Sequence, residues 1–80
     1  ADAAVAHGMT RKQAYLFVSQ TVLGAAKMLR DTGEHPGALK DAVCSPGGTT
    51  IAGVLALEKA GLRNAVIEAV DAAITAAQKL

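Results

Sequence analysis

Breaks that contain glycine cut this chain into five stretches in which apolar residues recur at helical spacing. The breaks fall at Gly8, at Gly33, at the run from Ser45 to Gly48 and at Gly61. Glycine commonly ends a helix, because it adopts the left-handed conformation that the residue after a helix needs. No stretch shows the apolar and polar alternation that indicates a strand. The pattern predicts an all-α fold, and 80 residues support a single domain.

Capping residues set the expected bounds of the helices. Thr10 and Gln13 fit a capping box, in which the threonine hydroxyl accepts a first-turn N–H and the glutamine side chain reaches back. Pro36 suits the first turn of a helix, where its missing N–H costs nothing. We expect helical segments over residues 1–7, from Arg11 to about Asp31, from Pro36 to about Val43, from Thr49 or Thr50 to about Ala60, and from Leu62 to about Lys79.

The expected helices are apolar over wide faces. In the long helix one stripe is formed by Ala14, Val18, Thr21, Val22, Ala25 and Leu29, and other sides by Leu16, Phe17 and Leu23. In the helix that begins at Thr49 or Thr50, Ile51, Val54 and Leu55 are expected to face inward. The last helix carries apolar residues at i, i+3, i+4 spacing, namely Val66, Ala69, Val70, Ala73, Ile74 and Ala77. A chain of 80 residues buries only about 60% of the surface that its unfolded form exposes. We therefore expect a partner to cover a second apolar face.

The run Ser45-Pro46-Gly47-Gly48-Thr49-Thr50 leads directly into an apolar helix. Two glycines let a ligand approach the backbone closely, and a helix start presents unpaired N–H groups and the positive end of the helix dipole. Together they predict a small anion-binding site with two hydroxyls beside it. The alternative is a plain turn followed by an ordinary helix cap.

Composition argues against several functions. A net charge of +1 gives no electrostatic footprint for nucleic acid or anionic membranes. The helix from Thr49 to Ala60 has a single basic residue, Lys59, so it does not suit the role of a recognition helix in a helix-turn-helix motif. No apolar stretch approaches the roughly 20 residues of a membrane span. Cys44 is the single cysteine, which favours a reducing compartment, and no cluster suggests a metal. His7 and His35 lie at helix ends, without a motif that pairs either with Cys44.

Twenty consecutive residues, Leu39 to Glu58, closely resemble the signature of the pyrroline-5-carboxylate reductase family. The segment from Gln20 to Leu29 is similar to the central dimerisation helix of that family, and the segment from Gly33 to Pro36 to the turn that follows it. The resemblance thus covers nearly the whole chain. One departure is Ala42, where some relatives carry a polar residue, so no cofactor contact is expected from that position.

The resemblance implies a particular architecture. Residues 1–80 would form an all-α C-terminal dimerisation and substrate-binding domain, similar to the C-terminal domain of 6-phosphogluconate dehydrogenases and interleaved with its twin. The partner would be a second copy, and dimers assemble further in many members. NADPH or NADH would be held mainly by an N-terminal dinucleotide-binding domain that residues 1–80 do not include. No residue here is assigned to the cofactor, because no glycine-rich fingerprint follows a strand.

The resemblance also implies a function and site residues. The whole enzyme would reduce the imine of 1-pyrroline-5-carboxylate to L-proline, the last step of proline biosynthesis, with hydride from NAD(P)H. The substrate carboxylate would lie on the N–H groups of Gly48, Thr49 and Thr50, in a loop that Ser45 and Gly47 line. The Thr50 hydroxyl would be the catalytic group, which orients the ring nitrogen and relays a proton from water.

Two alternatives stay open: a non-catalytic helical homodimerisation module, and a reductase of another cyclic imine. The family occurs in the cytoplasm and in eukaryotic mitochondria and plastids, and we expect a cytoplasmic enzyme. The chain begins at Ala1 and not at methionine, so we expect further sequence before it. The 80 residues alone are not expected to turn over substrate.

Overall fold

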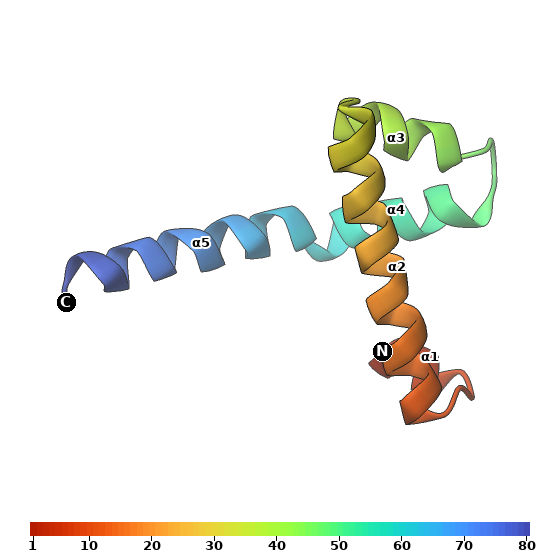
Figure 1. The fold of residues 1–80 in the computed structure, drawn as a ribbon, viewed down its shortest axis with the longest axis horizontal. Helices are drawn as coiled ribbons and strands as arrows, with labels where there is room; N and C mark the ends of the chain where they lie inside the picture. The colour runs from red at the N-terminus through yellow and green to blue at the C-terminus, as the bar shows by residue number, and fades with distance from the viewer. The chain divides into compact units, whose positions relative to one another are not determined.

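The computed structural model describes residues 1–80 and contains five helices without any strand (Figure 1). The helices are α1 (Asp2–Ala6), α2 (Arg11–Thr32), α3 (Pro36–Val43), α4 (Thr49–Ala60) and α5 (Leu62–Gln78). These bounds confirm the all-α prediction and agree with the expected helix ends to within a residue. Contacts divide the chain into two units, Ala1–Lys40 and Asp41–Leu80, and each is described by itself.

In the first unit, local hydrogen bonds fix both ends of α2. The Thr10 hydroxyl accepts the N–H of Gln13 at 3.2 Å, although the glutamine side chain does not return the second bond of a capping box. Gly33 ends the helix in the left-handed conformation, with φ 67°, and donates its N–H to Leu29 O. The bend at Gly8 lets α1 contact the start of α2, where Arg11 pairs with Asp2.

The short helix α3 has a histidine cap, in keeping with the position of His35 at a helix end. The N–H of Gly37 donates to Nδ1 of His35 at 2.9 Å, which satisfies one of the free amides of the first turn. A side chain on Gly37 would crowd this ring, because an added Cβ would lie 3.0 Å from the same Nδ1. His35 therefore has a structural role at the start of α3.

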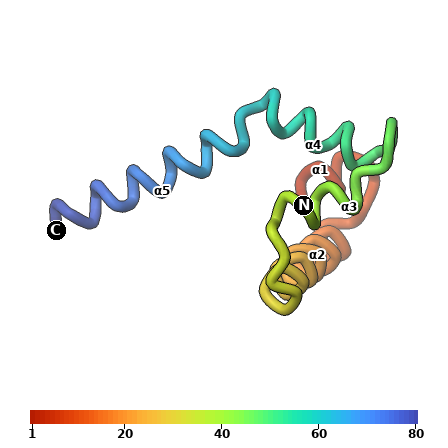
Figure 2. Tube along the Cα trace, turned by 90° about the horizontal axis from the view of Figure 1, so that it is seen from above, coloured from red at the N-terminus to blue at the C-terminus, as the bar shows by residue number.

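In the second unit, Gly61 separates α4 from α5. With φ 82° it ends α4 in the left-handed conformation and also stands at the start of α5. Figures 1 and 2 both show α5 leading away from α4 as a single helix. No other helix of this unit lies alongside α5, so its apolar side chains lack an internal partner.

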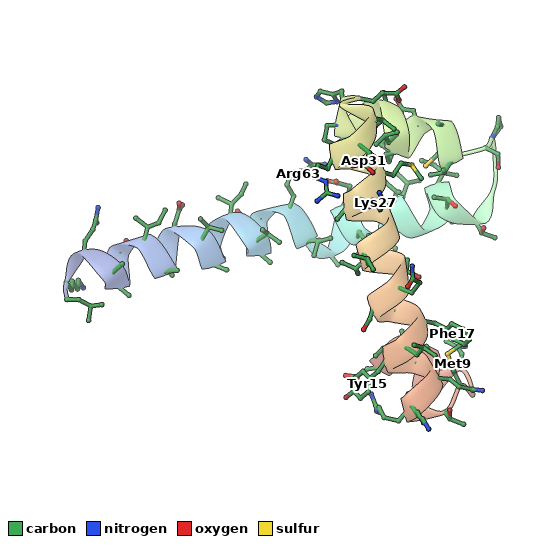
Figure 3. The ribbon with its side chains drawn as sticks, viewed as in Figure 1. Met9, Tyr15, Phe17, Lys27, Asp31 and Arg63 are labelled. Carbon is green, nitrogen blue, oxygen red and sulfur yellow. The ribbon has the colours of Figure 1, made fainter.

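The chain buries very little of its apolar surface. Ala14 is the only buried residue, as the stripe on α2 predicted, but Val22 of the same stripe is 63% exposed. On α4, Ile51 and Val54 are half-buried, whereas the expectation that Leu55 faces inward is wrong because no element of its unit covers it and it is 62% exposed. Figure 3 shows Tyr15 and Phe17 projecting from the first half of α2. The predicted apolar faces therefore exist, but the chain itself does not cover them.

Candidate functional site

A tight turn precedes α4. The N–H of Gly48 donates to the carbonyl of Ser45 at 3.1 Å, which places Pro46 and Gly47 at the two central positions. Proline fixes its own φ near −65° and Gly47 has a φ of 68°, the combination that defines a type II turn. The Pro-Gly pair therefore accounts for the reversal of the chain, and no contact with the rest of the molecule is needed to explain it.

The first turn of α4 is open. Its N-cap is Gly48, which has no side chain to accept the amides above it, and no other side chain replaces it. The first helical bond, from Ala52 N–H to Gly48 O, is 3.4 Å long. The N–H groups of Thr49, Thr50 and Ile51 donate to no atom of the chain. These donors and the helix dipole favour a bound anion.

Two hydroxyls accompany these amides. Thr49 and Thr50 are exposed, and neither hydroxyl makes a hydrogen bond within the chain. In α2, by contrast, the hydroxyls of Thr21 and Thr32 each donate to the carbonyl four residues earlier at 2.8 Å. Because no helical carbonyl precedes the first turn of α4, its threonine hydroxyls stay available to a ligand.

The structure brings the predicted site residues together with one change. Ser45, Gly47, Gly48, Thr49 and Thr50 lie in a single turn and helix start. The Gly48 N–H, expected as a carboxylate donor, instead closes the turn with Ser45.

Sequence reasoning missed the third free donor at this helix start, the Ile51 N–H. The signal was present, since proline followed by glycine indicates a turn whose last N–H is occupied.

The remaining candidate residues lie outside this turn or form no site. Cys44 is half-buried, and no group of three or more His, Cys, Asp or Glu side chains gathers anywhere in the chain. Arg63 (Figure 3) follows the far end of α4, where its 2.7 Å hydrogen bond to Glu58, together with their opposite charges, raises the pKa of its guanidinium. None of the helices is long and apolar enough to cross a membrane.

The fold and the open turn define a small helical domain with uncovered apolar faces and one helix start whose first N–H groups are free. The family model described as pyrroline-5-carboxylate reductase dimerisation matches residues 1–80. The chain belongs to this family, which confirms the resemblance and identifies the domain as a dimerisation domain.

Relatives from distant organisms agree over the full chain. The pyrroline-5-carboxylate reductase of Escherichia coli (strain K12) is 61% identical over 80 residues, which are 100% of this chain and 30% of that protein. The pyrroline-5-carboxylate reductase of Arabidopsis thaliana is 55% identical over 80 residues, which are 100% of this chain and 29% of that protein. The chain thus spans less than a third of the relatives that it matches.

Solved structures match this fold. The 1-pyrroline-5-carboxylate reductase of Streptococcus pyogenes matches with a TM-score of 0.95 and 43% identity, over 99% of this chain and 30% of that one. The Plasmodium falciparum pyrroline carboxylate reductase, solved with NADP bound, matches with a TM-score of 0.86 and 38% identity, over 90% of this chain and 28% of that one.

Proposed function

We propose that this domain forms a homodimer that supplies the substrate site of a pyrroline-5-carboxylate reductase. The complete enzyme reduces 1-pyrroline-5-carboxylate to L-proline. The observation that carries this proposal is the open start of α4, where three unpartnered N–H groups adjoin two free hydroxyls. A cyclic imine acid carries a carboxylate and a ring nitrogen close together, which are the two groups that such a start can hold.

The carboxylate lies on the N–H groups of Thr49, Thr50 and Ile51. Each bond to a charged acceptor is stronger than a neutral one, and the dipole of the 12-residue helix α4 adds to the attraction. Gly47 and Gly48 line the site without side chains, so the ligand reaches the backbone closely. Ser45 adds a hydroxyl from the far side of the turn.

Thr50 orients the ring nitrogen. A threonine hydroxyl is too weak an acid to protonate an imine outright near neutral pH, so it aligns the nitrogen and relays a proton from water. In the net reaction the imine carbon gains a hydride and the nitrogen gains a proton. Thr50 is the only residue of this chain that we assign to the chemical step.

The hydride comes from a nicotinamide cofactor, NADH or NADPH. The residues of this chain do not form a primary binding site for that cofactor. A dinucleotide fingerprint needs a strand before its glycine loop, whereas α3 precedes the loop here and the chain has no strand. We therefore assign the cofactor mainly to a dinucleotide-binding domain outside residues 1–80, and the 80-residue domain alone does not turn over substrate.

The partner is a second copy of this chain. Apolar side chains along α5 stand half-exposed, with Val66 at 56% and Val70 at 52%. Glycine inside a helix costs about 1 kcal/mol relative to alanine, yet no neighbour of this chain approaches within 4 Å of a Cβ added to Gly24 or Gly53. Close approach of a partner helix explains both features.

Titration with L-proline, the reaction product, tests the proposal. The domain is first shown to be a dimer by sedimentation, and its amide signals are then followed as proline is added. We expect shifts at Thr49, Thr50 and Ile51, whereas Gln13, whose N–H is bonded to Thr10, stays unchanged.

The alternatives predict other results. If the domain is a verified dimer and its amide signals do not shift when proline is added, the result favours a non-catalytic homodimerisation module. A reductase of another cyclic imine shows a higher kcat/KM on that ring than on 1-pyrroline-5-carboxylate when the complete enzyme is assayed.

A further inference from the structure

The two glycines of the turn are required for different reasons. Gly47 has a φ of 68°, a conformation that residues with a side chain rarely adopt. Gly48 has φ −81° and ψ 179°, an extended conformation that any residue adopts. The backbone therefore explains a glycine at position 47 but not at position 48.

A side-chain contact explains Gly48. A Cβ added there would overlap the hydroxyl oxygen of Ser45, whereas the Cβ of Ser45 would lie at an ordinary contact distance of 3.6 Å. The Ser45 hydroxyl thus occupies the space in which the side chain of a capping residue would begin. The Ser45 hydroxyl makes no hydrogen bond within the chain, so it lies at the start of α4 without using the free amides.

We propose that Gly48 is a positioning residue whose missing Cβ holds open the space for the Ser45 hydroxyl beside the substrate carboxylate. The inference rests on the proposed function, in which Ser45 lines that site. Because Gly48 is the N-cap, its own substitution by alanine leaves the Thr49, Thr50 and Ile51 amides in place.

The consequence of a side chain at position 48 is specific. Ser45 is exposed, so its hydroxyl has room to rotate away from an added Cβ. The nearest backbone atom, Ser45 O, would lie at 3.3 Å, which a small shift relieves. The turn therefore survives Gly48→Ala, and the loss falls on substrate binding.

A double-substitution cycle in the complete enzyme tests this inference. KM and kcat for 1-pyrroline-5-carboxylate and the Kd of L-proline are measured for the parent, Ser45→Ala, Gly48→Ala and the double variant. We expect each single substitution to raise KM and Kd by about tenfold, as loss of one hydrogen bond to a charged group does. The double variant should match Ser45→Ala, because alanine at 48 has no hydroxyl left to displace.

Other outcomes separate the positioning role of Gly48 from the proposed function. If the parent is active and the double variant has a KM roughly a hundredfold higher, the two effects multiply. This result overturns the positioning role of Gly48 and leaves the proposed function standing. The positioning role is also overturned if the Gly48→Ala variant keeps the KM of the parent, or if this variant no longer folds as a dimer. A parent that neither reduces the ring nor binds proline overturns the proposed function and this inference with it.

Discussion

The starts of α2 and α4 solve the same problem in opposite ways. Both helices leave amides of the first turn without helical partners. At α2 the Thr10 hydroxyl accepts the N–H of Gln13, so a side chain of the chain itself completes the start. At α4 the N-cap is Gly48, and no side chain accepts an amide.

Under the proposed function, the capped start of α2 is structural and the open start of α4 binds the substrate. A capped start lowers the free energy of the folded chain and offers little to a ligand. An open start gives up that stabilisation and keeps donors for an anion, here within an exposed turn whose shape Pro46 and Gly47 already set. The predictions below test whether the two starts differ in this way.

The largest expected effect is that of Thr50→Ala in the complete enzyme. Removing the hydroxyl should lower kcat/KM by about 100-fold or more, within the range of a positioned proton-transfer group. Steady-state kinetics with 1-pyrroline-5-carboxylate measure this, and Thr50→Ser should retain much of the activity. An alanine variant as active as the parent would remove Thr50 from the mechanism.

Closing the open start of α4 should weaken substrate binding. Gly48→Asp places an acceptor and a negative charge over the first-turn amides, so the substrate carboxylate loses donors and is repelled. We expect KM to rise by about 10- to 100-fold, because the displaced Ser45 hydroxyl, which costs about tenfold by itself, adds to the loss of the amide donors. Gly48→Asn, which caps without a charge, is the matched control and should have a smaller effect. Equal KM values for Gly48→Asp and the parent would contradict an anion site at this start.

Opening the capped start of α2 should change stability and not activity. Thr10→Ala removes the acceptor of the Gln13 N–H, and we expect the apparent free energy of unfolding to fall by about 1 kcal/mol. The measurement is denaturant unfolding at a fixed protomer concentration, since a dimer's stability depends on it. Thr10→Ser serves as the control. A KM that changes with Thr10→Ala would show that this start also serves the substrate site.

The smallest effect is expected in the last turns of α2, far from its start. Lys27 and Asp31 form an exposed ion pair one turn apart (Figure 3). Lys27→Gln should lower the apparent free energy of unfolding by only about 0.3 kcal/mol, and added salt should remove the difference. A loss as large as that of Thr10→Ala would mean that capping is not what distinguishes the start of α2.

Local chemistry made most of the fold predictable. The glycines at 33 and 61 ended α2 and α4 as expected, since both adopt positive φ. The turn at 45–48 was equally local, and its Pro-Gly pair fixes the conformation. Within this turn the Gly48 N–H was predicted to bind a ligand, but it closes the turn with the Ser45 carbonyl.

Burial was far less predictable than helix position. Periodicity assigned Leu55 to the inside, but the structure leaves it exposed, while Ala14 of α2 is buried. A repeat of apolar residues shows which face of a helix is favourable to bury. It does not show whether the same chain or another chain buries that face. The same limit applies to the site, where spacing does not reveal that the Ser45 hydroxyl fills the place of a side chain on Gly48.

The sequence alone therefore determined the helices, the turn before α4 and the family, because each depends on residues that are neighbours along the chain. Only the tertiary structure decided which amides stay free, which hydroxyl lies beside them and how much apolar surface is left bare. These depend on atoms meeting in space, where a difference of one ångström separates a hydrogen bond from an open donor.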